Sequence, residues 1–333
     1  MRYVALGDSY AAGVGGGERR NACWRADDGY PVQVARRLGL DVAYNACLGA
    51  TCADVLSHQL DALGPDTELV SITLGGNDIG FVPVLMAAAE PGWMSNSDVS
   101  IDHALIALRS RLPGLLDGVY AEVGRRAPAA RVIVTGYPRL FNGVDCNLAT
   151  FFSAHEMSRL NAAADELGST IAAAAHRAGF IYVGVGSRFA GHAVCDGVEW
   201  LNGVSWPLEG SFHPNSLGHN AYADAIQARL GEGVAPEDAG EGGSRVIEGP
   251  CVPGSAPTFS LPDLLGARSL GGARDIGLDP TEIEALAHQL YDGLAASREA
   301  AVLPDPGVAA AAARLNELDA IATARRGEVT MGG

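Results

Sequence analysis

The amino-acid sequence predicts an α/β protein built on a parallel sheet. Short apolar runs alternate with longer runs of helical periodicity through the first two-thirds of the 333 residues, and this alternation is typical of βαβ units. A hydrophobic content of 48% with 19% charged residues also supplies the apolar side chains that a sheet buried on both faces requires. We therefore expect helices on both faces of one sheet.

The expected strands are short, apolar and rich in β-branched residues. They cover residues 3–6, 42–44, 69–74, 131–135 and 180–185. Apolar residues at helical spacing between them predict helices over residues 31–38, 53–63, 102–125, 153–178 and 216–230. The apolar stretch 81–93 is expected to be a loop. Each strand but the last is thus followed by a helical crossover, as parallel pairing requires.

The composition changes after Leu230, where Gly, Pro, Glu and Ser dominate, and this change is typical of a linker. We expect a main domain over residues 1–232, a linker over 233–275 and a helical C-terminal extension over 276–333. Asp279, Pro280 and Glu282 have the spacing of a helix start, and a second helix begins near Asp305. Because two helices bury little surface alone, docking on the main domain is expected. Binding a protein partner and self-association are the alternatives.

The charge balance excludes several classes of partner. With 23 basic and 39 acidic residues the net charge is −16, which disfavours binding to nucleic acid and to anionic membranes. No apolar run approaches the roughly 20 residues of a transmembrane helix. The first strand begins almost at Met1, without the charged and apolar regions of a leader, and this start favours the cytoplasm.

Four short motifs contain residues suited to catalysis. Ser9 follows the first strand, Gly49 follows the second, Asn77 follows the third, and His213 precedes the last helix of the main domain. Each motif alone has an ordinary explanation as a turn or a helix cap. Parallel strands, however, bring their carboxyl ends to one edge of the sheet. We therefore expect these residues to lie close together.

Together these residues provide the groups that acyl transfer needs. Ser9 would be the nucleophile and His213 the base that takes its proton. The Ser9 N–H, the Gly49 N–H and the Asn77 side chain would stabilise the oxyanion. Metal binding by His213 and His219 is disfavoured, because their spacing and the lack of carboxylate ligands fit no standard site.

The four motifs, in this order and spacing, resemble the SGNH (GDSL) hydrolase superfamily, and especially actinobacterial secreted lipases and esterases. The resemblance covers about residues 1 to 230. It implies a three-layer α/β/α flavodoxin-like sheet and ester hydrolysis without a metal or organic cofactor. It also implies the same roles for Ser9, Gly49, Asn77 and His213.

One position departs from the family pattern. The family usually has Asp three residues before the histidine, where this chain has Gly210. A main-chain carbonyl of Gly210 or Ser211 can orient the imidazole instead; Glu209 and Asp196 are rival orienters. Activity is expected to rise as His213 loses its proton, between about pH 5 and 8.

The cysteines are the remaining motif. The six are Cys23, Cys47, Cys52, Cys146, Cys195 and Cys251, and none forms a Cys-x-x-Cys pair. The resemblance to the secreted branch implies disulfides between Cys23 and Cys47 and between Cys146 and Cys195. Cys52 and Cys251 would then be free or paired with each other. Two disulfides favour an extracytoplasmic location, against the cytoplasmic alternative above.

The substrate is less defined by the sequence than the chemistry. The apolar stretch 81–93, which includes Trp93, would line an acyl pocket or pack in the core, and Trp200 and Trp206 would approach from the His213 side. We expect a serine carboxylic ester hydrolase, a lipase or esterase that forms an acyl-enzyme on a lipid or small-molecule ester. The alternatives are an O-deacetylase of carbohydrates or small metabolites and a non-catalytic binding protein that works through its C-terminal helices.

Overall fold

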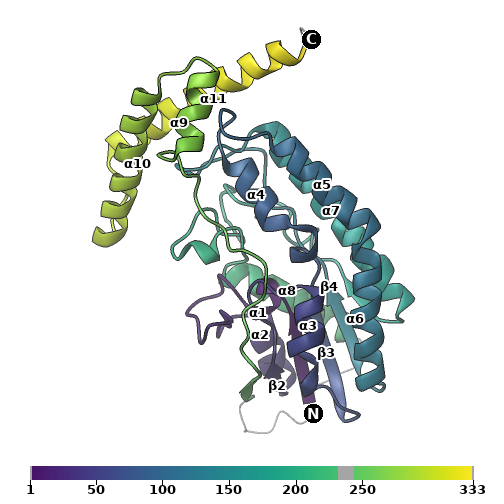
Figure 1. Cartoon of the computed structure of the whole chain (residues 1–333). Coiled ribbons are helices and arrows are strands. Elements are labelled where there is room, and N and C mark those ends of the chain that lie inside the picture. Colours follow the sequence, from purple (N-terminus) through teal and green to yellow (C-terminus); the bar gives the residue numbers. More distant parts are fainter. Residues whose placement is uncertain (1, 232–243, 332–333) are drawn as a thin grey trace. The chain divides into compact units, whose positions relative to one another are not determined.

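A computed structural model describes residues 2–231 and 244–331 of the chain (Figure 1). These residues form two compact units. The first unit comprises Met1–Pro83, Ile101–Asn142 and Met157–Phe259. The second comprises Val84–Ser100, Gly143–Glu156 and Ser260–Gly333. The second unit thus combines two segments from residues 1–232 with the C-terminal part of the chain.

The first unit is built on one parallel sheet of six strands. The strands are β1 (Arg2–Gly7), β2 (Asp41–Tyr44), β3 (Thr67–Thr73), β4 (Arg131–Thr135), β5 (Ile181–Val183) and β6 (Val246–Glu248). Their order across the sheet is β5-β4-β3-β1-β2-β6. The first five strands have the flavodoxin-like order, which confirms the predicted fold class. β6 was not expected, since its three residues lie in the stretch interpreted as a linker.

Helices cover both faces of this sheet (Figure 1). The α-helices within residues 1–232 are α1 (Ser9–Ala12), α2 (Tyr30–Leu38), α3 (Cys52–His58), α4 (Phe81–Ala89), α5 (Ser97–Ser110), α6 (Leu112–Arg126), α7 (Ala154–Arg177) and α8 (Ser216–Leu230). Two expectations were wrong. Residues 81–89 form a helix rather than a loop, and the single helix expected over 102–125 is two helices. Pro113, in the first turn of α6, lacks the N–H that would continue the preceding helix.

One face of the sheet is aliphatic. Side chains alternate along each strand, and Val4, Ile72 and Val134 belong to the set that points to this face. There they pack with α3, α6 and α7 in one buried cluster that includes Leu116 and Ile171. We call this the aliphatic face. Apolar burial of this kind is the main source of folding free energy.

The opposite face, which we call the tyrosine face, carries tyrosines and hydroxyl groups under α1, α2 and α8. The Tyr30 and Tyr222 rings stack there with centroids 5.3 Å apart. The Tyr30 hydroxyl lies 2.9 Å from Thr73 Oγ1, and the Tyr222 hydroxyl donates to the Gly136 carbonyl at 2.8 Å. These buried polar atoms are paired, as burial requires.

The second unit is helical. Its C-terminal part contains α9 (Ala267–Asp275), α10 (Pro280–Ala300) and α11 (Pro306–Met331), so the segment interpreted as a linker also includes a helix. These helices bury Leu290 and Leu315 in a core that also contains Trp93 and Phe151. The Trp93 indole donates to Ser269 Oγ at 3.0 Å. The helical extension therefore packs on two segments that come from residues 1–232.

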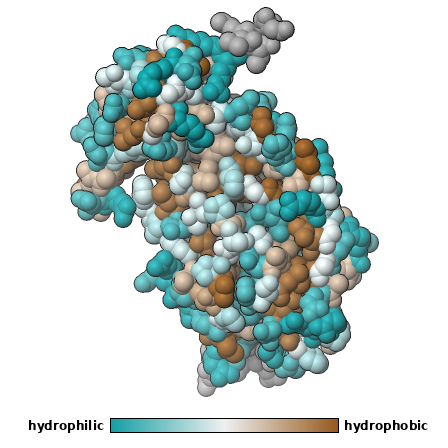
Figure 2. Space-filling model, in the orientation of Figure 1, coloured by the Kyte–Doolittle hydropathy of each residue, from teal (hydrophilic) through white to brown (hydrophobic). Residues whose placement is uncertain are grey.

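Hydrophobic residues lie among hydrophilic ones on the face of the molecule shown in Figure 2. Within residues 2–231 and 244–331, no helix has the length and apolar character that spanning a bilayer demands.

The expected cysteine chemistry is present. Cys23 and Cys47 form a disulfide, and Cys146 and Cys195 are also disulfide-bonded. Cys52 is a buried free thiol and Cys251 an exposed one, so these two are not paired with each other.

Candidate active site

The candidate active site lies at the carboxyl ends of β1 and β3, where the order of strands reverses. From β1 the chain crosses to β2 on one side and then to β3 on the other, and such a switch point leaves a crevice outside the strand ends. Gly7 of β1 pairs with Thr73 of β3, so Ser9 and Asn77 follow neighbouring strands.

Gly7 makes the close approach of these strands possible. Its φ is +124°, and a Cβ atom there would lie 2.1 Å from the Thr73 carbonyl oxygen. Only glycine fits such a position. The next residue, Asp8, caps α1 by accepting from the Tyr10 N–H at 3.0 Å. Ser9 therefore begins a short helix directly above the sheet.

Ser9 and His213 form a hydrogen-bonded pair. His213 Nε2 lies 2.7 Å from Ser9 Oγ, although the two residues are 204 positions apart in the chain. The other ring nitrogen, Nδ1, lies 2.9 Å from the Ser211 carbonyl oxygen. A carbonyl only accepts hydrogen bonds, so Nδ1 carries the proton, and Nε2 of the neutral ring accepts from the serine hydroxyl.

The Ser211 carbonyl therefore occupies the place of an orienting acid. Of the two rival carboxylates, Asp196 accepts from the Ala193 N–H and the Asn142 amide, and Glu209 acts on the imidazole through its main chain rather than through its carboxylate. A neutral acceptor fixes the tautomer and the ring position just as a carboxylate does. It adds no negative charge that would stabilise the imidazolium.

Desolvation lowers the pKa of His213 to about 4. The hydrogen bond to Ser211 opposes this shift, and the electrostatic influence of buried His219 adds to it. The imidazole is thus neutral, and able to accept a proton, above about pH 5. A pKa lowered in this way places the expected rise of activity below the range of pH 5 to 8 that an ordinary histidine gives.

The candidate oxyanion donors come from two loops beside Ser9. Gly49 has a φ of +74°. Within the described parts of the chain, neither its N–H nor that of Ser9 has a hydrogen-bond partner. Asn77 Nδ2 donates to the Ala50 carbonyl at 3.0 Å, which fixes the amide and leaves its second hydrogen available. The Cys47 N–H donates to the Gly7 carbonyl at 3.1 Å, so the loop before Gly49 is held to β1.

Tyr137 connects the serine loop to the asparagine loop, and sequence reasoning missed it. Its hydroxyl donates to Asp8 Oδ2 and accepts from the Gly76 N–H at 3.1 Å. Burial raises the pKa of Asp8 to about 7, against the lowering effect of the Tyr137 hydrogen bond. Asp8 and Gly76 immediately precede Ser9 and Asn77, so Tyr137 fixes the spacing of two catalytic candidates.

A second missed tyrosine supports the histidine. The Tyr10 hydroxyl donates to the Phe212 carbonyl at 2.9 Å, and its ring centroid lies 5.2 Å from that of His213. Phe212 has a φ of +58°, a conformation that costs a non-glycine residue free energy and often occurs at functional sites. Nothing in the local sequence around Tyr10 indicates this contact, because Phe212 lies 202 positions away in the chain.

Four further residues that the sequence singled out are the three tryptophans Trp93, Trp200 and Trp206, and His219. Trp93 is 1% exposed in the core of the second unit. The Trp200 ring stacks on His192 with centroids 3.8 Å apart, so both tryptophans have packing roles. Trp206 is 44% exposed. His219 is buried, with Nε2 bonded to the Val14 carbonyl at 3.1 Å.

The segment after β6, residues 249–256, lies against the oxyanion loop, and we call it the strap. Its Gly254 N–H donates to the Leu48 carbonyl at 2.9 Å, and its Ala256 N–H donates to the Gly49 carbonyl at 3.1 Å. Gly49 is packed so closely that a Cβ atom there would lie 2.9 Å from the Ala256 carbonyl oxygen. The strap thus binds the peptide groups on both sides of Gly49, including the Leu48–Gly49 group that carries the free N–H.

Known lipases are similar to this chain in sequence and in fold. Residues 5–221 match the model of the GDSL-like Lipase/Acylhydrolase family. A lipase from Streptomyces rimosus is 40% identical over 66% of this chain and 82% of its own length, and Lipase 1 from Streptomyces coelicolor is 38% identical with the same coverage. The crystal structure of the extracellular Streptomyces rimosus lipase has a TM-score of 0.64 and 36% identity over 68% of this chain and 99% of that one.

A phospholipase A1 from Streptomyces albidoflavus is equally similar. Its TM-score is 0.63, with 36% identity over 68% of this chain and 98% of that one. The matched family residues include the serine, glycine and asparagine loops and His213. The chain therefore belongs to the GDSL-like lipase/acylhydrolase family and is a carboxylic ester hydrolase of the lipase and esterase type.

Proposed function

We propose that this protein hydrolyses acyl esters through a Ser9–His213 dyad and an acyl-enzyme. The observation that supports this most directly is the 2.7 Å contact between Ser9 Oγ and His213 Nε2. A serine hydroxyl is a weak nucleophile until a neighbouring base takes its proton. His213 is neutral over most of the working range of an enzyme, so it is ready to act as that base.

In the first half of the reaction, Ser9 Oγ bonds to the ester carbonyl carbon and its proton passes to His213 Nε2. The negative charge that develops on the carbonyl oxygen is stabilised by the Ser9 N–H, the Gly49 N–H and Asn77 Nδ2. The Ser211 carbonyl holds Nδ1–H and so keeps Nε2 directed at the serine. His213 then protonates the leaving alcohol as the ester C–O bond breaks.

In the second half, water replaces the alcohol. His213 takes a proton from the water as its oxygen bonds to the acyl carbon, and the same three donors stabilise the second oxyanion. Breaking the bond to Ser9 Oγ releases the carboxylic acid and returns the proton to Ser9. Each residue thus acts twice, first in acylation and then in deacylation.

The proposal includes the division of the chain into a hydrolase domain, a connecting segment and a helical extension. Ser9, Gly49, Asn77 and His213 all fall within residues 1–232, the expected hydrolase domain, and the family match lies in the same range. Residues 233–275 connect it to the extension at 276–333. Function outside the cytoplasm is supported by the extracellular relative and by the two disulfides.

The test is hydrolysis of a chromogenic ester series, from acetyl to long acyl chains, by the wild type and by Ser9→Ala. We expect turnover to be lost in the variant by about 10⁴-fold or more, with an unchanged circular dichroism spectrum. Full activity in Ser9→Ala would contradict the dyad. The chain-length optimum separates a lipase from an O-deacetylase, which would act on acetyl esters alone.

A further inference from the structure

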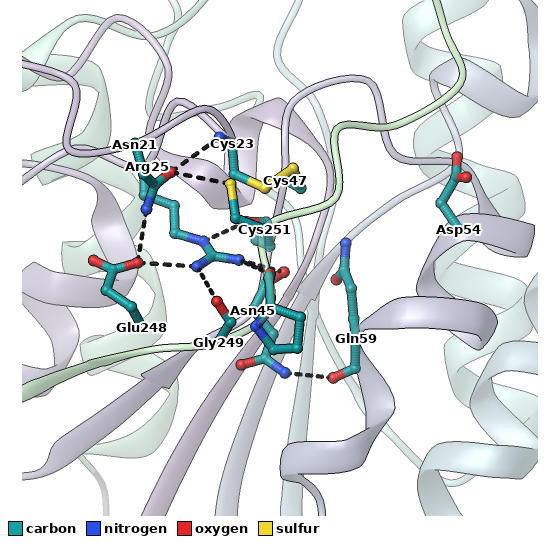
Figure 3. The surroundings of a disulfide bond; sticks show 12 residues. Asn21, Cys23, Arg25, Asn45, Cys47, Asp54, Gln59, Glu248, Gly249 and Cys251 are labelled. Atoms are coloured by element: carbon teal, nitrogen blue, oxygen red, sulfur yellow. Dashed lines mark hydrogen bonds and ion pairs between the residues drawn. A yellow bond between two sulfur atoms is a disulfide. The ribbon is translucent and has the colours of Figure 1, made fainter.

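The exposed thiol of Cys251 lies beside a disulfide bond that it does not belong to. The sulfur atoms of Cys23, Cys47 and Cys251 all lie within 4.8 Å of one another. Figure 3 shows the Cys251 sulfur next to that of Cys23, with the Cys47 sulfur on the far side. A free thiol in this position is the arrangement that thiol–disulfide exchange requires.

The surroundings hold these three residues together. The buried Arg25 guanidinium donates to the Gly249 and Pro250 carbonyls of the strap at 2.9 and 2.7 Å, and to the Ala46 carbonyl before Cys47 at 2.8 Å. It also pairs with Glu248 at 2.9 Å (Figure 3). The strap residue before Cys251 and the residue before Cys47 are therefore bound to the same side chain.

The thiol itself is accessible and loosely held. Cys251 is exposed, and its Sγ lies 3.7 Å from Asn21 Oδ1. Small thiols and disulfides can therefore reach it from solvent, and the thiolate is the form that attacks a disulfide. Cys52, the other free thiol, is buried, and burial raises its pKa well above the usual range.

We propose that Cys251 and the Cys23–Cys47 disulfide form an intramolecular thiol–disulfide exchange site that transfers the crosslink from the oxyanion loop to the strap. The Cys251 thiol gives its proton to solvent, and the thiolate sulfur bonds to Cys23 Sγ. The Cys23–Cys47 bond breaks, and Cys47 leaves as a thiolate that takes up a proton. One disulfide and one thiol exist before and after, so no oxidant or reductant is consumed.

The exchange changes which segments are covalently joined. Cys47 lies two residues before Gly49, so its release removes the covalent anchor of the oxyanion loop. The strap becomes tied to Cys23 instead. The consequence for hydrolysis rests on the proposed function: a less restrained Gly49 N–H stabilises the oxyanion less well, and the rearranged isomer is the less active one.

The test is disulfide mapping of the full chain, which does not depend on activity. Wild type is incubated at about pH 8.5 and about pH 5, quenched in acid, alkylated and digested for peptide mass analysis. The expected result at the higher pH, where more thiolate forms, is a Cys23–Cys251 peptide with alkylated Cys47 in about 1–10% of chains. Cys251→Ser is the control and should show the original disulfide alone.

Two further variants isolate each possible bond. Cys47→Ser leaves Cys23 facing Cys251 and should form that disulfide when oxidised glutathione is added. Cys23→Ser should instead accumulate separate glutathione adducts on Cys47 and Cys251. The proposal would be overturned if wild type shows the original disulfides alone and Cys47→Ser shows only separate adducts. A dominant Cys47–Cys251 bond would instead show that Cys47, and not Cys23, is the sulfur that Cys251 attacks.

The link to catalysis has its own readout. Oxidised Cys47→Ser should have a lower kcat than wild type, by up to the roughly 10²-fold that losing one oxyanion donor costs, while Cys251→Ser should match wild type. Equal kcat in all three would leave the exchange established and refute its coupling to Gly49. A failed Ser9→Ala test would refute the dyad without affecting the mapped disulfides.

Discussion

The two faces of the sheet in the first unit are built from different side chains. On the aliphatic face, the strands present Val, Ile and Leu to α3, α6 and α7. On the tyrosine face, hydroxyl groups and rings continue from Tyr30 and Tyr222 to Tyr10, whose ring contacts that of His213. Apolar packing is not directional, whereas hydrogen bonds fix distances and angles. The comparison indicates that the aliphatic face stabilises the fold and the tyrosine face positions the site.

The largest effect is expected at the base. His213→Ala should reduce kcat on the order of 10⁴- to 10⁶-fold and leave the melting temperature nearly unchanged. In wild type, kcat/KM should rise with pH through about 4 as the imidazole becomes neutral, and remain high above pH 5. An acid limb centred near pH 6.5 would show that burial does not lower the pKa of this histidine.

The next effect concerns the oxyanion. Asn77→Ala removes one donor and should lower kcat by about 10²- to 10³-fold with little change in KM, because the charge it stabilises is absent from the bound ester. Steady-state kinetics on one chromogenic ester measures both constants. A rise in KM at constant kcat would instead assign Asn77 to substrate binding.

The aliphatic face should respond in the opposite way. Leu116 is fully buried in its cluster, and Leu116→Ala should lower the free energy of unfolding by about 2–5 kcal/mol. Its kcat per folded molecule should stay close to that of wild type. Denaturant unfolding together with active-site titration separates these quantities. A large loss of kcat in fully folded protein would show that the aliphatic face also positions the site.

The smallest effect is expected from removing the Tyr137 hydroxyl, and a buried tyrosine on the aliphatic face provides the control. Tyr137→Phe leaves Asp8 and the Gly76 N–H without their shared partner, which should cost about 1–3 kcal/mol and lower kcat. Because that hydrogen bond lowers the pKa of Asp8, any inflection from this carboxyl near pH 7 should move to higher pH.

The control is Tyr120→Phe on the aliphatic face. Within the described parts of the chain, the Tyr120 hydroxyl is buried without a hydrogen-bond partner, so its removal should be neutral or slightly stabilising. Equal losses of stability and kcat in the two variants would show that Tyr137 contributes packing alone.

The sequence by itself determined the fold class and the chemistry of the site. Alternating apolar runs specify βαβ units, and their connections place Ser9, Gly49 and Asn77 at one edge, since parallel strands all end on the same side. Pairing of Cys23 with Cys47 also followed from the family resemblance. These features depend on local periodicity and on short motifs, which the sequence displays directly.

Only the tertiary structure decided which atoms support that site. Ser211 orients His213 through a main-chain carbonyl, and every residue type offers one. Tyr137 reaches Asp8 across 129 positions, and the strap reaches Gly49 across more than 200. β6 and the packing of the C-terminal helices on Trp93 likewise depend on partners far away in the sequence. Such contacts form between segments that are far apart in the sequence, so no local sequence pattern predicts them.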